Sequence, residues 1–227
     1  INYSPFAQTA RLDMSNPASD PGFSGVWHDL TSFGSDATAQ AGLGVQDNFP
    51  TGGKSISFGS TGWMNFEGYN PLSSCSNKPP AATINMWVYN SHKSNHQFIG
   101  GSRQGSDGMY FLILNYDVTE ARLGTDTDYW DISVDYSSYL NKWTFVSFVA
   151  QPTRTDLYLD GVLVGSNTQI TGNFNTISNF SIGAEAAAPG NNHANAGNMG
   201  YCSVYDRSLS AAEVLVEYNA TKAYYGY

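Results

Sequence analysis

The sequence has few charged residues, and about two thirds of them are acidic. Asp, Glu, Lys and Arg together make up 13% of the 227 residues, and nineteen acidic against ten basic side chains give a net charge of −9. No run of basic residues is present that could neutralise a phosphate backbone, so we expect no nucleic-acid partner. An anionic membrane surface would repel such a chain as well.

Long hydrophobic runs and cysteines are equally scarce. No apolar stretch approaches the ~18 residues of a membrane-spanning helix, so we expect no membrane insertion. The two cysteines, Cys75 and Cys202, lie far apart and outside any Cys-x-x-Cys motif, which argues against a zinc or redox site of that type. They could form one disulfide that closes a long loop or remain two thiols, and the sequence leaves both open.

What the chain does contain is a series of short strand-like segments. Most of them alternate apolar with polar residues or are rich in aromatic residues, and turn residues separate them. These segments occupy residues 54–58, 63–67, 82–90, 108–116, 142–150, 179–185 and 199–206. The first two flank a glycine-rich turn. Because no helices alternate with the strands, the pattern predicts an all-β antiparallel sandwich of two sheets in a single domain, residues 1–227. Residues 1–10 are expected to form an N-terminal arm.

One hairpin has a clear local signal. In residues 155–166, Asp160 and Gly161 stand between two pairs of apolar residues in alternating positions. Asp-Gly supplies the positive φ angles of a two-residue type I′ turn, whose twist matches that of the strands. The segment is therefore predicted to be a β-hairpin.

One helix is predicted near the end of the chain, over residues 210–220. Ser210, with Glu213 three residues later, forms a capping box that marks the start of a helix. An apolar stripe on one face of this helix is expected to cover an edge or an open end of the sandwich. The stripe consists of Val214, Leu215 and Tyr218.

Several segments resemble a known family. Residues 197–227 resemble the closing strand and helix of laminin-G-like domains in the concanavalin A-like lectin/glucanase superfamily, and residues 141–165 are similar to its Trp-led strand and Asp-Gly hairpin. Residues 12–38 and 52–66 resemble the opening of such domains. The resemblance covers nearly the whole chain and implies a jelly-roll sandwich with one short C-terminal helix. The closing stretch also resembles modules of tailed-phage structural proteins and bacterial surface proteins.

The resemblance does not extend to the hydrolases of that superfamily. Their Glu-x-Asp-x-(x)-Glu strand is absent here, and glycosidic hydrolysis needs two carboxyl groups held roughly 5–10 Å apart. The glutamates of the chain are Glu67, Glu120, Glu185, Glu213 and Glu217. We therefore expect no enzymatic activity. A glycoside hydrolase or lyase that uses another pair of carboxylates is an alternative.

The densest acidic cluster lies in residues 124–135. On an extended strand, Asp126, Asp128 and Trp130 would share one face and Asp131 the other. Ca²⁺ prefers several carboxylate and carbonyl oxygens, so the three aspartates are candidate calcium ligands. Trp130 and its neighbour Tyr129 could stack on a sugar ring. The alternative is a solvated edge strand whose charges deter pairing with other sheets.

A long polar loop, residues 185–198, is the other candidate ligand site. Loops of this length often have a function. Its candidate sugar-binding residues are Asn191, Asn192, His193 and Asn195. A plain connecting loop is the alternative.

These features together predict a non-catalytic attachment module outside the cell or on the surface of a virus particle. The expected partner is a glycan, bound in the manner of a lectin and with Ca²⁺ as a candidate cofactor. The alternative is a structural or decorating subunit, whose partner is a capsid or surface protein or further copies of the chain in an oligomer or lattice.

Overall fold

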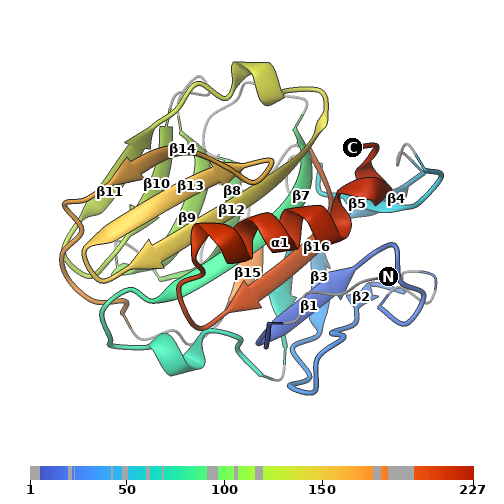
Figure 1. Cartoon of the computed structure of the whole chain (residues 1–227). Helices are drawn as coiled ribbons and strands as arrows, with labels where there is room; N and C mark the ends of the chain where they lie inside the picture. The colour runs from blue at the N-terminus through green and yellow to red at the C-terminus, as the bar shows by residue number, and fades with distance from the viewer. Residues whose placement is uncertain are drawn as a thin grey trace.

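The computed structural model describes residues 6–19, 22, 24–41, 43–47, 51–59, 62–67, 69–90, 97–104, 107–115, 120–175, 180–183 and 197–227. In this part of the chain, two eight-stranded sheets stack into a sandwich, and a single α-helix lies across one of them (Figure 1). Every strand pairing is antiparallel. The predicted fold class, an all-β sandwich with one short C-terminal helix, is confirmed.

The first sheet, sheet A, has the order β14-β13-β12-β7-β16-β5-β4, and β1 also pairs with β16. Its strands are β1 (Ala10–Asp13), β4 (Gly44–Gln46), β5 (Ser55–Ser57), β7 (Ala82–Asn90), β12 (Trp143–Gln151), β13 (Arg154–Leu159), β14 (Val162–Asn167) and β16 (Gly197–Tyr205).

The second sheet, sheet B, has the order β11-β10-β9-β8-β15-β6-β3-β2. Its strands are β2 (Val26–Trp27), β3 (Ala37–Ala41), β6 (Trp63–Phe66), β8 (Gln97–Gln104), β9 (Asp107–Asn115), β10 (Glu120–Gly124), β11 (Tyr129–Ser133) and β15 (Ser181–Ile182). The helical elements are η1 (Ser73–Cys75), η2 (Ser137–Tyr139), α1 (Ala211–Thr221) and η3 (Lys222–Tyr225).

The predicted hairpin is present as β13 and β14. Asp160 and Gly161 have φ angles of 51° and 78°, as a type I′ turn requires. The Asp160 side chain also accepts a hydrogen bond from the backbone N–H of Phe145 (2.9 Å), which ties the turn to β12.

The strands predicted at 54–58 and 63–67 form, but they do not make a hairpin with each other. β5 belongs to sheet A and β6 to sheet B, so the chain crosses from one sheet to the other between them. β5 pairs with β4 and β16, and β6 pairs with β3 and β15. These partners are distant in the sequence except for β4, and a local pattern does not specify them.

Helix α1 begins with the predicted capping box, in which Ser210 and Glu213 each accept a hydrogen bond from the other's backbone N–H. The helix does not cover an edge of the sandwich as expected. It lies across the outer face of sheet A (Figure 1), where Tyr218 packs on Trp87 of β7 and Phe145 of β12. Both faces of the middle of sheet A are therefore buried.

The helix face also differs from the expected stripe. Val214 is buried and Tyr218 is partly buried, but Leu215 is 46% exposed. Glu217 takes the buried position instead, and its carboxylate accepts hydrogen bonds from the hydroxyls of Tyr205 (2.6 Å) and Tyr201 (3.1 Å). A hydrophobic pattern misses this residue because its partners are hydroxyl groups on β16.

The described part of residues 1–10 is not a loose arm. Ala10 is the first residue of β1, and Gln8 and Thr9 before it are buried. Gln8 donates a hydrogen bond to the Tyr205 hydroxyl (2.9 Å), and Thr9 donates one to the carbonyl of Val204 (3.1 Å). Residues 1–5 lie outside the described residues.

Cys75 and Cys202 are buried free thiols, which decides between the two alternatives for them. Cys202 is inside sheet A on β16, and Cys75 ends the short helix η1, where its thiol donates to the carbonyl of Ala81 (3.3 Å). Among the described residues, no helix is both long enough and apolar enough to cross a membrane.

Candidate functional site

The predicted calcium ligands lie at the turn between β10 and β11. Asp126 and Asp128 are in the turn itself, not on an extended strand as expected. Asp126 exchanges two hydrogen bonds with Asn173: its N–H donates to the Asn173 carbonyl (2.9 Å), and its carboxylate accepts from the Asn173 N–H (2.7 Å). The Asp128 carboxylate accepts from the N–H of Tyr129 (2.8 Å). Both carboxylates therefore satisfy backbone groups of loops.

The third candidate ligand, Asp131, points outward from β11 and forms a two-pronged ion pair with Arg122 on β10. The distances are 2.5 Å to the guanidinium Nε and 2.9 Å to Nη2. Nowhere in the described part of the chain do three His, Cys, Asp or Glu side chains gather as a metal-binding group. The three aspartates therefore do not share one ligand set, and calcium binding at this turn stays a prediction.

The two aromatic residues predicted to stack on sugar point to opposite sides of β11. Tyr129 is 39% exposed, and the Arg122 guanidinium lies 5.2 Å from the centre of its ring. Trp130 packs against the hydrophobic core, and its indole N–H donates to the hydroxyl of Thr125 (3.2 Å). Of the two, Tyr129 is the one that a ligand could reach across an open face. The loop candidates Asn191, Asn192, His193 and Asn195 lie outside the described residues.

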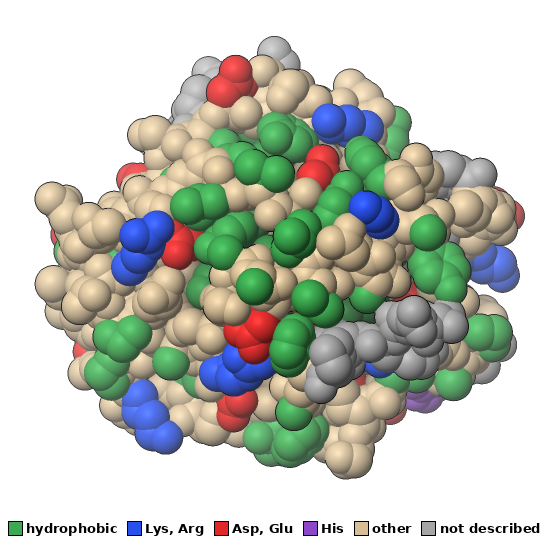
Figure 2. Space-filling view, viewed as in Figure 1, with side chains coloured by type: hydrophobic (Ala, Val, Ile, Leu, Met, Phe, Trp, Pro, Cys, Tyr) green, Lys and Arg blue, Asp and Glu red, His purple; other side chains and the backbone are tan. Residues whose placement is uncertain are grey.

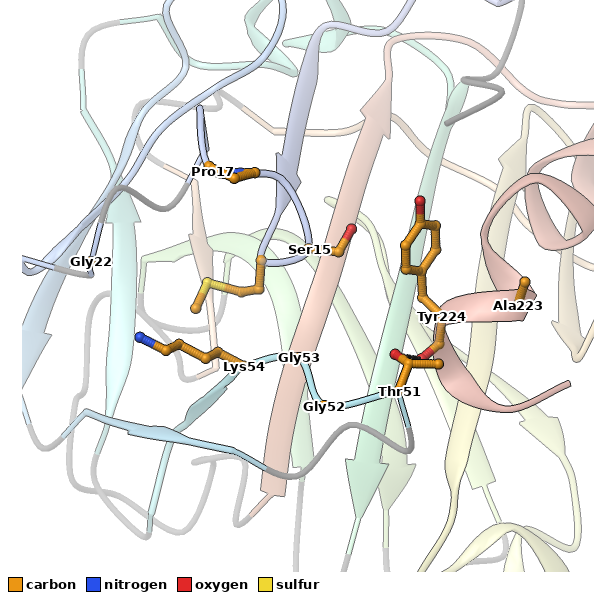
Figure 3. Close-up of a pocket in the computed structure, with 10 residues that line it drawn as sticks. Ser15, Pro17, Gly22, Thr51, Gly52, Gly53, Lys54, Ala223 and Tyr224 are labelled. Carbon is orange, nitrogen blue, oxygen red and sulfur yellow. Dashed lines mark hydrogen bonds between the residues drawn. The ribbon is translucent and has the colours of Figure 1, made fainter.

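A cavity of about 500 Å³ lies elsewhere, where three segments distant in sequence meet. Its volume is within the usual range for small-molecule sites. Figure 3 shows the loop after β1, the loop that leads into β5, and η3 around it. It is lined by Met14, Ser15, Pro17, Gly22, Thr51, Gly52, Gly53, Lys54, Ala223 and Tyr224.

Hydrogen bonds hold the walls of this cavity together. The Thr51 hydroxyl donates to the carbonyl of Tyr224 (2.9 Å) and so joins the loop before β5 to η3 (Figure 3). The N–H of Met14 donates to the carbonyl of Gly200 on β16 (3.0 Å), which fixes the first loop to sheet A. The walls of the cavity are thus joined to one another and to sheet A.

The residues that line the cavity are mostly uncharged. Ser15 donates its hydroxyl hydrogen to the buried carboxylate of Asp13 (2.6 Å), so the lone pairs of its oxygen remain for a ligand. Burial raises the pKa of Asp13, and the hydrogen bonds from Ser15 oppose this rise. Lys54 is the charged side chain among the lining residues, and Tyr224 is the aromatic one.

Sequence reasoning missed this cavity. The signal that was available is weak: two successive glycines before a lysine, at Gly52 and Gly53, leave one wall without side chains. Tyr224 follows the predicted helix, and no motif in the sequence marks it as a binding residue. No pattern in one segment indicates that these loops meet, because the contact depends on how β1, β5 and the C-terminus are placed on sheet A.

Three glutamates have side chains that the structure describes: Glu67, Glu213 and Glu217. Glu213 is engaged in the capping box and in an ion pair with Arg207 (2.8 Å), and Glu217 is fully buried on the face of α1 that packs against sheet A. Glu67 is exposed on sheet B, where it contacts Gln40. No Asp or Glu is among the described residues that line the cavity. A pair of carboxyl groups that face each other across a sugar-sized gap is absent from that lining.

Comparison of the sequence with known families gives one result. The sequence profile of the Concanavalin A-like lectin/glucanases superfamily matches residues 58–215, well over half of the chain. None of the curated proteins compared with the chain matches it in sequence.

Several solved structures of low sequence identity have a similar fold. Domain 4 of AbnA, a GH43 extracellular arabinanase from Geobacillus stearothermophilus, was solved in complex with arabinotriose. The match covers 92% of this chain and 97% of the AbnA domain, with a TM-score of 0.67 and 16% sequence identity. The receptor binding domain of the botulinum neurotoxin C/D mosaic serotype matches 94% of this chain, with a TM-score of 0.68 and 15% identity. The chain spans 51% of that toxin domain. A related toxin binding domain, solved in complex with SialylT, has a TM-score of 0.65 at 15% identity. Identities this low establish the fold alone.

Proposed function

The chain belongs to the Concanavalin A-like lectin/glucanases superfamily, and from that premise we propose that it is a non-catalytic carbohydrate-binding domain. The observation that most supports this function is the likeness to AbnA domain 4, a domain of nearly the same extent that was solved with a bound trisaccharide. The toxin domains support it less, since this chain spans about half of their length. In this function the domain lies outside a cell or on a virus particle and attaches that cell or particle to a polysaccharide or glycan.

A domain that only binds needs a preorganised surface with polar groups and an aromatic side chain, and both the cavity and the face around Tyr129 provide these. The two surfaces lie on different elements and can be tested separately.

The direct test is isothermal titration of the whole chain with a panel of soluble oligosaccharides, with and without EDTA. A saturable signal with at least one saccharide supports the function, and silence across the panel contradicts it. Loss of the signal in EDTA would support the calcium ion predicted near Asp126, Asp128 and Asp131. The same mixtures, assayed for new reducing ends, test the glycoside hydrolase or lyase alternative, which requires their release.

A second candidate function is that of a structural or decorating subunit. The observation in its favour is an exposed apolar group beside the β13–β14 turn, formed by Val162 (63% exposed), Leu163 (44%) and Leu215 (46%). Figure 2 shows hydrophobic side chains gathered on the face that bears α1. Analytical ultracentrifugation tests this candidate: concentration-dependent association that Leu215→Ser abolishes would support it, whereas a monomer at all concentrations would count against it.

A further inference from the structure

We propose that the cavity between residues 14–17, 51–54 and 223–224 is a saccharide-binding site, and that it selects saccharides that bear an acid group. This inference rests on the proposed carbohydrate-binding function and deepens it by assigning the site and the ligand class. It differs from the sites that the sequence predicted, which lie on the β10–β11 turn and on the loop at 185–198.

The cavity is preorganised. Its three walls come from separate segments, and the bonds from Thr51 to the Tyr224 carbonyl and from Met14 to the Gly200 carbonyl hold them in place. A site whose walls are already fixed does not lose loop entropy when a ligand binds. Tyr129, by contrast, lies 39% exposed on β11, beside the ion pair between Arg122 and Asp131.

The cavity also offers the groups that bind sugars. Tyr224 presents a half-buried aromatic side chain, which gives an apolar surface with a polar tip. Ser15 keeps its acceptor lone pairs, since its hydrogen is directed to Asp13. Gly52 and Gly53 leave one wall bare, so a ring can approach the backbone there.

The cavity carries a positive charge at one end. In Figure 3, Tyr224 and Ala223 border one end of the cavity, and Lys54 and Gly22 border the other. The ammonium group of Lys54 is the one cationic group among the described lining residues, in a protein whose net charge is −9. An anionic ligand is repelled by such a protein in general and gains a charge-assisted hydrogen bond only where a cation is placed. The arrangement fits a short saccharide with a sugar ring at Tyr224 and a carboxylate or sulfate at Lys54.

The experiment uses the whole chain and two matched pairs of probes. The first pair is trigalacturonic acid and its neutral methyl ester, and the second is 3′-sialyllactose and lactose. Each is titrated by calorimetry into the wild type, Lys54→Gln and Tyr224→Ala. Tyr129→Ala tests the other surface that could bind sugar, and Lys142→Gln, which changes a lysine outside the cavity, is the control. Thermal unfolding of every variant establishes that it is folded.

The expected result is that the wild type binds the acidic member of at least one pair more tightly than the neutral member. Lys54→Gln lowers the affinity for the acidic member about tenfold, the order expected for one lost charge-assisted hydrogen bond. It leaves the affinity for the neutral member unchanged. Tyr224→Ala lowers the affinity for both members. Tyr129→Ala and Lys142→Gln bind both members as the wild type does. Because Lys54 is exposed, its variant is informative even if Tyr224→Ala fails to fold.

Three results would overturn the inference. If Tyr129→Ala abolishes binding while Lys54→Gln and Tyr224→Ala do not, the protein binds carbohydrate at another place, and the proposed function stands without this site. If the wild type binds neutral saccharides and neither acidic probe, the assigned ligand class is wrong while the function again stands. If the wild type binds no saccharide in this set or in the wider panel, the proposed function fails as well.

Discussion

Glu217 is a fully buried acidic side chain at the junction between α1 and sheet A. Its two carboxylate oxygens accept from the hydroxyls of Tyr205 and Tyr201, and the Gln8 amide donates to the same tyrosine oxygens from the N-terminal segment. Burial, and next the charge of Glu217, raise the pKa of Tyr201 well above its usual range, so the hydroxyl keeps its hydrogen for the bond. One side chain thus ties the helix, the last strand and the first described segment together.

We expect Glu217→Ala to lower the free energy of unfolding by about 2–4 kcal/mol, because it leaves two buried hydroxyls without their acceptor and opens a cavity. Chemical denaturation monitored by circular dichroism measures the change. Glu67→Ala, at an exposed position, is the control and is expected to stay within about 0.5 kcal/mol of the wild type. Equal stability of the two variants would show that the buried network contributes nothing.

At the scale of elements, the parts that could be predicted are those whose signal is contained in a few adjacent residues. The Asp160-Gly161 turn and the Ser210–Glu213 capping box are both present as the sequence indicated. The separation of β5 and β6 into different sheets was not predictable, because a strand pattern indicates which residues alternate and not which sheet the strand joins. The buried position of Glu217 was missed for a related reason, since its partners are tyrosines on another element.

The hairpin turn gives a test at this scale. Gly161 has a φ of +78°, and a Cβ placed on it would lie 3.1 Å from Leu215 and Tyr218 atoms of α1. We expect Gly161→Ala to destabilise the protein by about 1–2 kcal/mol, since the left-handed backbone is strained for residues other than glycine. Gly44→Ala is the matched control, because a Cβ there meets nothing within 4 Å. Thermal denaturation of both variants decides whether the turn is constrained as described.

The helix start gives a pH-dependent test. The hydrogen bond from Arg207, and then that from the Ser210 backbone, lower the pKa of Glu213 from 4.5 to about 2. A carboxyl group with a lowered pKa stabilises the fold above its unfolded pKa, and this stabilisation is lost as the pH falls toward the folded pKa. The advantage of the wild type over Glu213→Gln should therefore be full above about pH 5 and disappear between about pH 4.5 and pH 2.

The size of this advantage is expected to be small, about 0.5–1 kcal/mol, because the ion pair with Arg207 is partly exposed to solvent. Urea denaturation of both proteins at a series of pH values measures it. An advantage that stays constant down to pH 2 would contradict the assignment of the effect to the charge of Glu213. Arg207→Gln should reduce this pH-dependent advantage without abolishing it, since the hydrogen bond from the Ser210 backbone to Glu213 remains.

At the scale of the whole molecule, the sandwich with one capped helix could be inferred from the sequence, but the cavity could not. Its walls come from the segments around residues 15, 52 and 224, and only the placement of β1, β5 and η3 around sheet A brings them together. The acidic cluster at Asp126, Asp128 and Asp131 was recognisable as a cluster in sequence, yet the fold distributes these carboxylates among separate backbone and arginine partners. Local density of one residue type did not establish a shared site.

The proposed function is that this protein binds carbohydrate and does not cleave it. Calorimetric titration of the whole chain with the oligosaccharide panel, followed by an assay of the same samples for new reducing ends, tests both halves of the claim together. We expect saturable binding of at least one saccharide and no increase in reducing ends. Release of reducing ends, or no binding across the panel, would contradict it.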